Sequence, residues 1–149
     1  MGDSKKNTEE RTYLSQRKAE DIVTRLNKCL SKHNDIAFAF LFGSSVHDQS
    51  SVFSDVDIAI YFAGTTDFYR INNLREELSA LLGKEIDIVV LNNASPILRM
   101  QVLKKGRLIV DLNRRLYHAF FSNTVKEYDD LKRNRKDIED NILRGRIYA

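Results

Sequence analysis

Two short segments of the sequence hold residue types that phosphate chemistry needs. An apolar run ends at Gly43-Ser44, and ten residues later the chain reads Asp55-Val56-Asp57. Glycine lets backbone amides approach a phosphate closely, and a serine hydroxyl can donate a hydrogen bond while it caps a short helix. The first segment therefore predicts a phosphate-binding turn.

The aspartates of the second segment predict a cation site. Side chains alternate between the two faces of a strand, so Asp55 and Asp57 project to the same side. Asp87 interrupts a later apolar run, and its carboxylate can join the pair if the two strands are neighbours. Carboxylates held close together repel one another unless a cation offsets their charge. Magnesium, as two ions that clamp the attacking and leaving oxygens, fits such a site and fits transfer to a hydroxyl.

The helices and strands that must position these residues are predicted from the spacing of apolar residues and from glycine and proline at their ends. Strand patterns cover 35–42, 57–62, 85–91 and 107–111, and helical patterns cover 15–31, 68–82 and 96–105. Gly83 and Gly106 end the last two helices, and Pro96 begins one of them. Residues 114–146 predict a long C-terminal helix or a pair of helices.

Length and composition indicate one compact domain, since 149 residues with 42% hydrophobic content suffice for a core. We expect a flexible polar N-terminus over 1–12 and a single domain over 13–149. The formal charge of +3 is low for a dedicated nucleic-acid binder, so no direct nucleic-acid binding is expected. The sequence shows no signal peptide, and its longest apolar run, 36–42, is too short to span a bilayer. We therefore expect a cytoplasmic protein without a membrane partner.

The remaining reactive side chains carry weaker signals. Cys29 is the only cysteine, so it cannot form an internal disulfide, and we expect it in the core because no Cys/His cluster has zinc-ligand spacing. The residues around His33 and His118 show no pattern that would support a catalytic role for either histidine. Basic residues surround Gly106 and either meet phosphates or complement a helix dipole; they are Lys104, Lys105 and Arg107.

Taken together, the motifs resemble the minimal nucleotidyltransferases of the DNA-polymerase-β-like superfamily, whose motif is Gly-Ser, ten residues, then Asp-x-Asp. The resemblance continues to Asp87 and to the basic segment around Gly106, and it spans roughly residues 15–145. It implies an α/β (α+β) fold: a small mixed β-sheet packed on one face by helices, with a long C-terminal helical segment.

The resemblance also implies roles for single residues. Asp55 and Asp57 would bind the metal ions, and Asp87 would be a third ligand or would activate the attacking hydroxyl. The triphosphate of ATP, the donor substrate, would lie on the turn formed by Gly43, Ser44 and Ser45. One departure concerns a position three residues after the motif serine, where many family members carry arginine and this chain has His47.

The acceptor that the resemblance implies is a protein. Standalone members of this family are typically antitoxins paired with a HEPN-domain toxin ribonuclease, and they transfer AMP from ATP to a tyrosine hydroxyl of the toxin. A hetero-oligomer with the toxin is compatible with that role. Two alternatives stay open: an aminoglycoside-type enzyme that modifies a small-molecule hydroxyl, which the short length disfavours, and a catalytically weak antitoxin that neutralises its toxin by binding alone.

Overall fold

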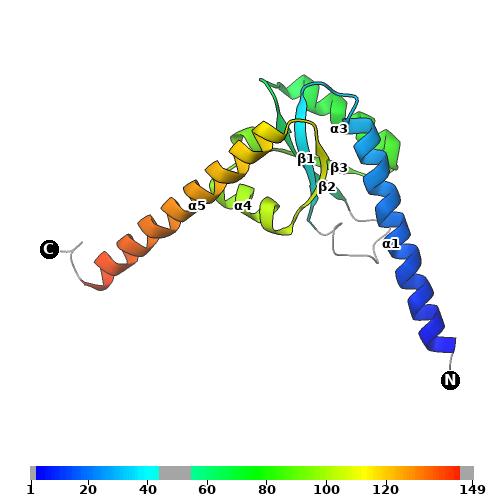
Figure 1. Cartoon of the computed structure of the whole chain (residues 1–149), viewed down its shortest axis with the longest axis horizontal. Helices are drawn as coiled ribbons and strands as arrows, with labels where there is room; N and C mark the ends of the chain where they lie inside the picture. The colour runs from blue at the N-terminus through cyan, green and yellow to red at the C-terminus, as the bar shows by residue number, and fades with distance from the viewer. Residues whose placement is uncertain (1–2, 44–54, 145–149) are drawn as a thin grey trace.

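The computed structural model of the chain describes residues 3–43 and 55–144. Figure 1 shows the arrangement of its elements, which follow one another as α1 (Asp3–Leu30), β1 (Ile36–Phe42), β2 (Val56–Phe62), α3 (Phe68–Leu82), β3 (Ile86–Val90), the short 3₁₀ helix η1 (Leu91–Asn93), α4 (Pro96–Lys105), β4 (Arg107–Asp111) and α5 (Arg114–Leu143). No helix within these residues is long and apolar enough to cross a membrane.

The strands form one mixed sheet in the order β3-β2-β1-β4. Strand β1 is antiparallel to both β2 and β4, whereas β2 and β3 are parallel. A parallel pair needs a crossover connection, which α3 provides between β2 and β3. The predicted mixed sheet with a long C-terminal helix is therefore confirmed.

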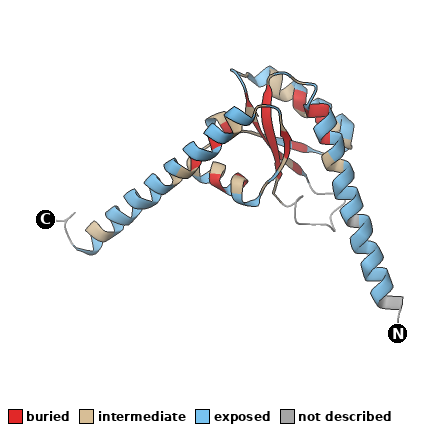
Figure 2. Ribbon diagram, viewed as in Figure 1, coloured by how far each residue is buried: buried red, intermediate tan, exposed pale blue. Residues whose placement is uncertain are grey.

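Helices cover both faces of this sheet, whereas we expected them on one face. Helices α1 and α3 enclose one cluster of buried residues with the sheet, and α4 and α5 enclose a second cluster on the other face. The reason lies in β1, whose sequence IAFAFLF is apolar at every position. Both faces of such a strand must be covered, and Figure 2 shows the buried residues concentrated where the helices meet the sheet.

The ends of α3 and α4 lie where the sequence predicted them. The Asp67 side chain caps α3 by accepting from the Arg70 amide at 2.8 Å, and Gly83 ends that helix with a φ of 63°. Ser95 caps α4 by accepting from the Leu98 amide at 3.2 Å, with proline in the first turn. These caps satisfy backbone groups that a helix end leaves unpaired.

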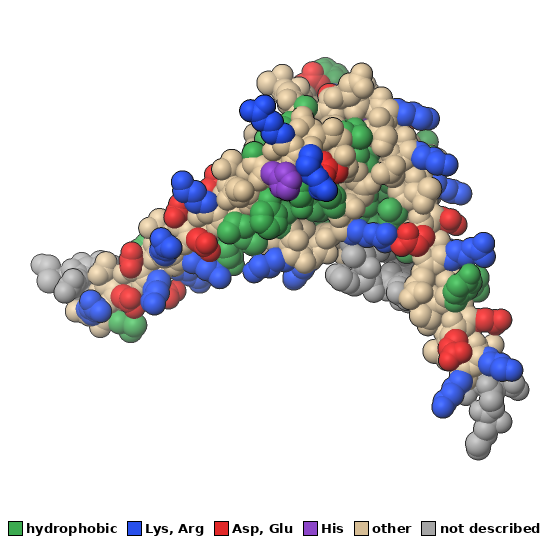
Figure 3. All heavy atoms as spheres, in the orientation of Figure 1, with side chains coloured by type: hydrophobic (Ala, Val, Ile, Leu, Met, Phe, Trp, Pro, Cys, Tyr) green, Lys and Arg blue, Asp and Glu red, His purple; other side chains and the backbone are tan. Residues whose placement is uncertain are grey.

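Two helices extend well beyond the sheet. Helix α1 begins at Asp3, so the polar segment expected before the domain is helical from that residue, and α5 is one continuous helix rather than a pair. The outer parts of both are almost entirely exposed (Figure 2). Charged side chains of both signs line them in Figure 3, which fits the solvated helix faces expected of interleaved acids and bases.

Candidate active site

The three predicted acids meet at one end of the sheet. In the parallel pairing of β2 with β3, Asp57 lies directly opposite Asp87. The two strands are therefore neighbours, as the prediction for Asp87 required. Asp55 immediately precedes β2. Asp57 is half-buried, and the other two aspartates are exposed to solvent. We call Asp55, Asp57 and Asp87 the acidic site.

Strand alternation decides which face carries these carboxylates. Val56 and Ile58 flank Asp57 and belong to the core beneath α1 and α3, so Asp57 projects to the opposite face. In β3, Ile86 and Ile88 flank Asp87 and belong to the same α1–α3 side. Both carboxylates therefore lie on the face of the sheet that α4 and α5 cover further along the strands. At the start of the strands, where the two acids lie, their carboxylates are accessible to solvent.

Gly43, the first residue of the predicted phosphate-binding turn, lies against this site. It follows Phe42, the partner of Asp57 in the antiparallel pairing of β1 with β2. Its φ is +84°, a conformation that favours glycine, and a Cβ added there would collide with the Asp57 carboxylate. Both the backbone conformation and the available space thus require glycine. Ser44, Ser45 and His47, the other residues named for this turn, lie outside the described residues.

Among the residues that the structure describes, no base compensates the charge of the acidic site. Burial raises the pKa of Asp57, and the negative charges of Asp87 and Asp55 raise it further. Within 3–43 and 55–144, no lysine or arginine forms an ion pair with any of the three carboxylates. Mutually repelling carboxylates beside a glycine turn are a donor set that suits a hard divalent cation such as Mg²⁺.

Two of the basic residues around Gly106 have partners of their own. Arg107 lies 3.0 Å from Glu20 of α1, and the Lys104 ammonium lies 5.3 Å from the centre of the Tyr128 ring. A Cβ at Gly106 would meet the Val102 carbonyl oxygen of α4 at 2.5 Å, so this glycine fits the tight end of that helix. These contacts favour the structural interpretation of the basic segment.

A second polar cluster lies near the start of β1, whereas the acidic site lies near its end. Cys29, His33 and Glu77 converge there, with Asp35 and Arg70 beside them; we call these five residues the α1–α3 cluster. Cys29 is buried, as expected. The only sequence signal for the cluster is the four-residue spacing of Cys29 and His33 across a helix end, because tertiary packing brings Glu77 to them.

Comparisons with known proteins bear on the acidic site. The family model described as Polymerase beta, Nucleotidyltransferase matches residues 24–115, a range that contains Gly43 and all three acids. The protein adenylyltransferase MntA of Shewanella oneidensis is 30% identical over 104 residues, which are 70% of this chain and 74% of that protein.

Two solved structures contain similar chains. In a crystal structure of a toxin-antitoxin with AMP-PNP, the matched chain has a TM-score of 0.64 and 26% identity, covering 84% of this chain and 98% of that one. In a structure of the tri-AMPylated Shewanella oneidensis HEPN toxin in complex with MNT antitoxin, the values are 0.60 and 26%, with 87% and 98% covered. These likenesses extend over nearly the whole length of the matched chains.

Proposed function

This chain belongs to the polymerase beta nucleotidyltransferase family, and from that premise we propose that it is a protein adenylyltransferase acting as the antitoxin of a HEPN-domain toxin. The donor is ATP, and the acceptor is a tyrosine hydroxyl of the toxin ribonuclease. The observation that carries the proposal is the pairing of Asp57 with Asp87 beside Gly43. It occurs in a chain similar to chains from a toxin-antitoxin structure with AMP-PNP and from a complex of an AMPylated HEPN toxin with MNT antitoxin.

We propose that the acidic site holds Mg²⁺, as two ions. Its donor atoms are carboxylate oxygens, which this cation prefers, and their mutual repulsion favours cation binding. When bound, the ions polarise the phosphoryl oxygens and neutralise charge that builds up on the leaving group. The Gly43 turn, with Ser44 and Ser45, would hold the triphosphate against the carboxylates. Gly43 supports this role because its missing side chain lets the Asp57 carboxylate lie directly against the Gly43 backbone.

The reaction is an in-line displacement at the α-phosphorus of ATP. A bond forms between the tyrosine oxygen and that phosphorus, the bond to the β-phosphate oxygen breaks, and pyrophosphate leaves. The phenolic proton is lost to a base or to solvent. Asp87 is exposed and lies directly opposite Asp57, so it is available either as a third cation ligand or as that base.

The product explains neutralisation in physical terms. AMP adds bulk and a negatively charged phosphodiester to the tyrosine. If this tyrosine lies near the ribonuclease site, the added charge repels RNA phosphates where they must bind. Inactivation would then persist after the two proteins separate, so neutralisation requires no tight complex.

The test is to incubate the chain with its candidate toxin and Mg-ATP and to weigh the toxin intact. We expect the mass of the toxin to rise by one or more AMP units and its ribonuclease activity to fall with the same time course. The double variant Asp55→Asn, Asp57→Asn should produce neither change. An unmodified toxin with the wild-type chain would overturn the proposal.

The same double variant separates transfer from neutralisation by contact. If it blocks the ribonuclease as fully as the wild-type chain does, without a change in toxin mass, binding alone accounts for the antitoxin activity. If the ribonuclease stays active, transfer is required. Toxin and antitoxin at equal concentration, with size-exclusion chromatography in parallel, distinguish these two results.

A further inference from the structure

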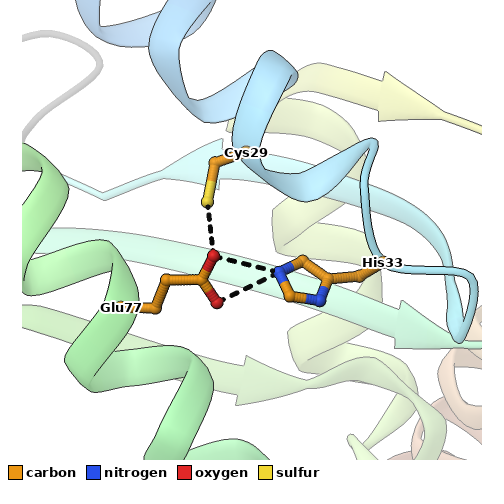
Figure 4. A group of neighbouring side chains, drawn as sticks. All are labelled: Cys29, His33 and Glu77. Atoms are coloured by element: carbon orange, nitrogen blue, oxygen red, sulfur yellow. Dashed lines mark hydrogen bonds and ion pairs between the residues drawn. The ribbon is translucent and has the colours of Figure 1, made fainter.

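In the α1–α3 cluster, three side chains with metal-binding atoms converge from α1, from the turn that follows it and from α3. Figure 4 shows Cys29 from the last turns of α1, His33 from the turn that follows, and Glu77 from α3. The Cys29 sulfur lies 3.3 Å from Glu77 Oε1, and His33 Nε2 lies 3.1 Å from Glu77 Oε2. One donor atom from each residue lies within 4.8 Å of the other two.

We propose that Cys29, His33 and Glu77 form a second cation site, selective for a borderline or soft divalent ion of the Zn²⁺ class. In a tetrahedral zinc site, metal–ligand bonds of about 2.0–2.3 Å separate neighbouring ligand atoms by roughly 3.3–3.6 Å. The separations around Glu77 are already close to those values. A water molecule would complete the four ligands, because the protein provides three.

The helices that carry the ligands are fixed by the core. Leu26 and Leu30 of α1, and Leu74 and Leu78 of α3, are all completely buried in one cluster. The His33 backbone amide donates to the Leu30 carbonyl at 3.1 Å, which holds the turn against the helix end. A cation entering from the solvent side of Glu77, whose side chain is 46% exposed, would meet ligands that packing has already positioned.

The charges balance for a divalent ion. Burial, and then the hydrogen bond to Glu77, raise the pKa of Cys29 to about 11, so the sulfur carries a proton in the metal-free chain. Cation binding displaces that proton, and the resulting thiolate and the Glu77 carboxylate together neutralise two positive charges. His33 binds as a neutral ligand. One proton is therefore released for each ion bound.

Arg70 opposes cation binding at this site, so a substitution of Arg70 should change the cation affinity in a predictable direction. Its guanidinium donates to both Asp35 oxygens, at 2.7 and 2.8 Å, and another of its contacts is His33 Nδ1 at 3.0 Å. Because arginine only donates, Nδ1 accepts and Nε2 carries the proton without metal. A cation at Nε2 transfers that proton to Nδ1, where it faces Arg70. Removing this conflict should strengthen cation binding.

Cobalt(II) titration of the intact chain tests the proposal, with excess Mg²⁺ present to occupy the acidic site. We expect one Co²⁺ per chain with a near-ultraviolet thiolate-to-cobalt absorption band. Cys29 is the only cysteine in the sequence, so the band has one possible source. Cys29→Ser should abolish it, and Asp57→Asn should retain it. A folded wild-type chain without the band would overturn the proposal.

Zinc affinity, measured by competition with a coloured chelator, provides a second readout that does not depend on the cysteine variant alone. His33→Gln and Cys29→Ser should each weaken Zn²⁺ binding by more than about tenfold. Arg70→Gln, whose amide oxygen can accept from Nδ1, should tighten it. Equal Zn²⁺ affinity in the wild type, His33→Gln and Cys29→Ser would contradict the site, and weaker binding by Arg70→Gln would contradict the role given to Arg70.

Discussion

The two ends of strand β1 carry polar clusters that differ in how their acidic side chains are paired. The acidic site at its far end joins three carboxylates, and none of them has an ion-pair partner in the parts of the chain that the structure describes. In the α1–α3 cluster at its start, Asp35 pairs with the positively charged Arg70, and the Glu77 carboxylate accepts a hydrogen bond from His33. Like charges therefore gather at one end, whereas each acid at the other end has a partner.

The pKa directions express this difference. Burial and two neighbouring carboxylates raise the pKa of Asp57, whereas the hydrogen bond from Arg70 lowers that of Asp35. Paired charges stabilise the fold that contains them, and unpaired like charges weaken it until a ligand arrives. This contrast supports the proposal that the acidic site binds an external cation, whereas the paired charges of Arg70 and Asp35 stabilise the structure.

After the double variant of Asp55 and Asp57, the largest effect on transfer should come from the third acid, Asp87. Asp87→Asn should lower the rate of AMP transfer by about a hundredfold or more, because it removes a cation ligand or base directly opposite Asp57. Glu85→Gln is the matched control, since Glu85 is an exposed acid two residues earlier. Toxin modification followed by intact mass measures both. Similar rates of AMP transfer for the two variants would contradict a role for Asp87 as a cation ligand or base.

Gly43 should have the next largest effect. Gly43→Ala forces a Cβ into the Asp57 carboxylate, and a misplaced carboxylate should lower transfer by at least about tenfold. Gly83→Ala is the control, because Gly83 also has a positive φ, of 63°, but has no atom within 4 Å of its added Cβ. Both changes should destabilise the fold by about 1–2 kcal/mol. If both variants retain full activity, the turn does not position Asp57.

At the other end of β1, Arg70→Met should reduce stability and spare catalysis. Loss of the two-bond pair with Asp35 should cost about 1 kcal/mol in urea unfolding, with AMP transfer changed less than about twofold. Arg135→Met removes an exposed pair with Glu139 on α5, so it should cost less. A large loss of transfer in a stably folded Arg70→Met chain would show that the two ends are coupled.

The smallest effects concern pH, and their signs are opposite. Asp35 has a lowered pKa, so its stabilisation is present above the unfolded value, about 3.9, and is lost as pH falls through the folded value. Asp57 has a raised pKa, so stability is full below the unfolded value and falls as pH rises through the folded one. At neutral pH without divalent cations, Asp57→Asn should therefore stabilise the chain and Asp35→Asn should destabilise it.

Urea unfolding at pH 7 and at about pH 3 in the presence of a chelator compares these two variants. At the acidic pH both differences from the wild type should shrink, because Asp57, with its raised pKa, is then largely protonated, and the stabilisation from Asp35 diminishes as the pH falls below the unfolded pKa toward the lowered folded pKa. If Asp57→Asn destabilises the chain at neutral pH, the acidic site is not under electrostatic strain.

Local patterns predicted much of the fold and the grouping of the acids. Caps at Asp67 and Ser95, and the stop at Gly83, are encoded by adjacent residues, which explains why α3 and α4 lie where the sequence predicted them. The pairing of Asp57 with Asp87 was predicted only conditionally, because sequence does not fix which strands are neighbours. The strand order and register of the structure show that Asp57 lies opposite Asp87.

Features set by packing between distant segments could not be predicted. The second helical layer depends on how α4 and α5 return to the sheet, and Glu77 reaches Cys29 only because α3 packs beside α1. The start of α1 was missed because its outer part has no apolar stripe to reveal a helix. The roles of Ser44 and Ser45 in holding phosphate remain predictions.

Manganese binding tests most directly whether the acidic site is a cation site for nucleotide transfer. Mn²⁺ replaces Mg²⁺ as a paramagnetic probe, and electron paramagnetic resonance counts free ions in the presence of a non-hydrolysable ATP analogue. The wild type and Arg70→Met should bind Mn²⁺ alike, and Asp57→Asn should lose most of that binding. Equal binding by the wild type and Asp57→Asn would contradict the assignment.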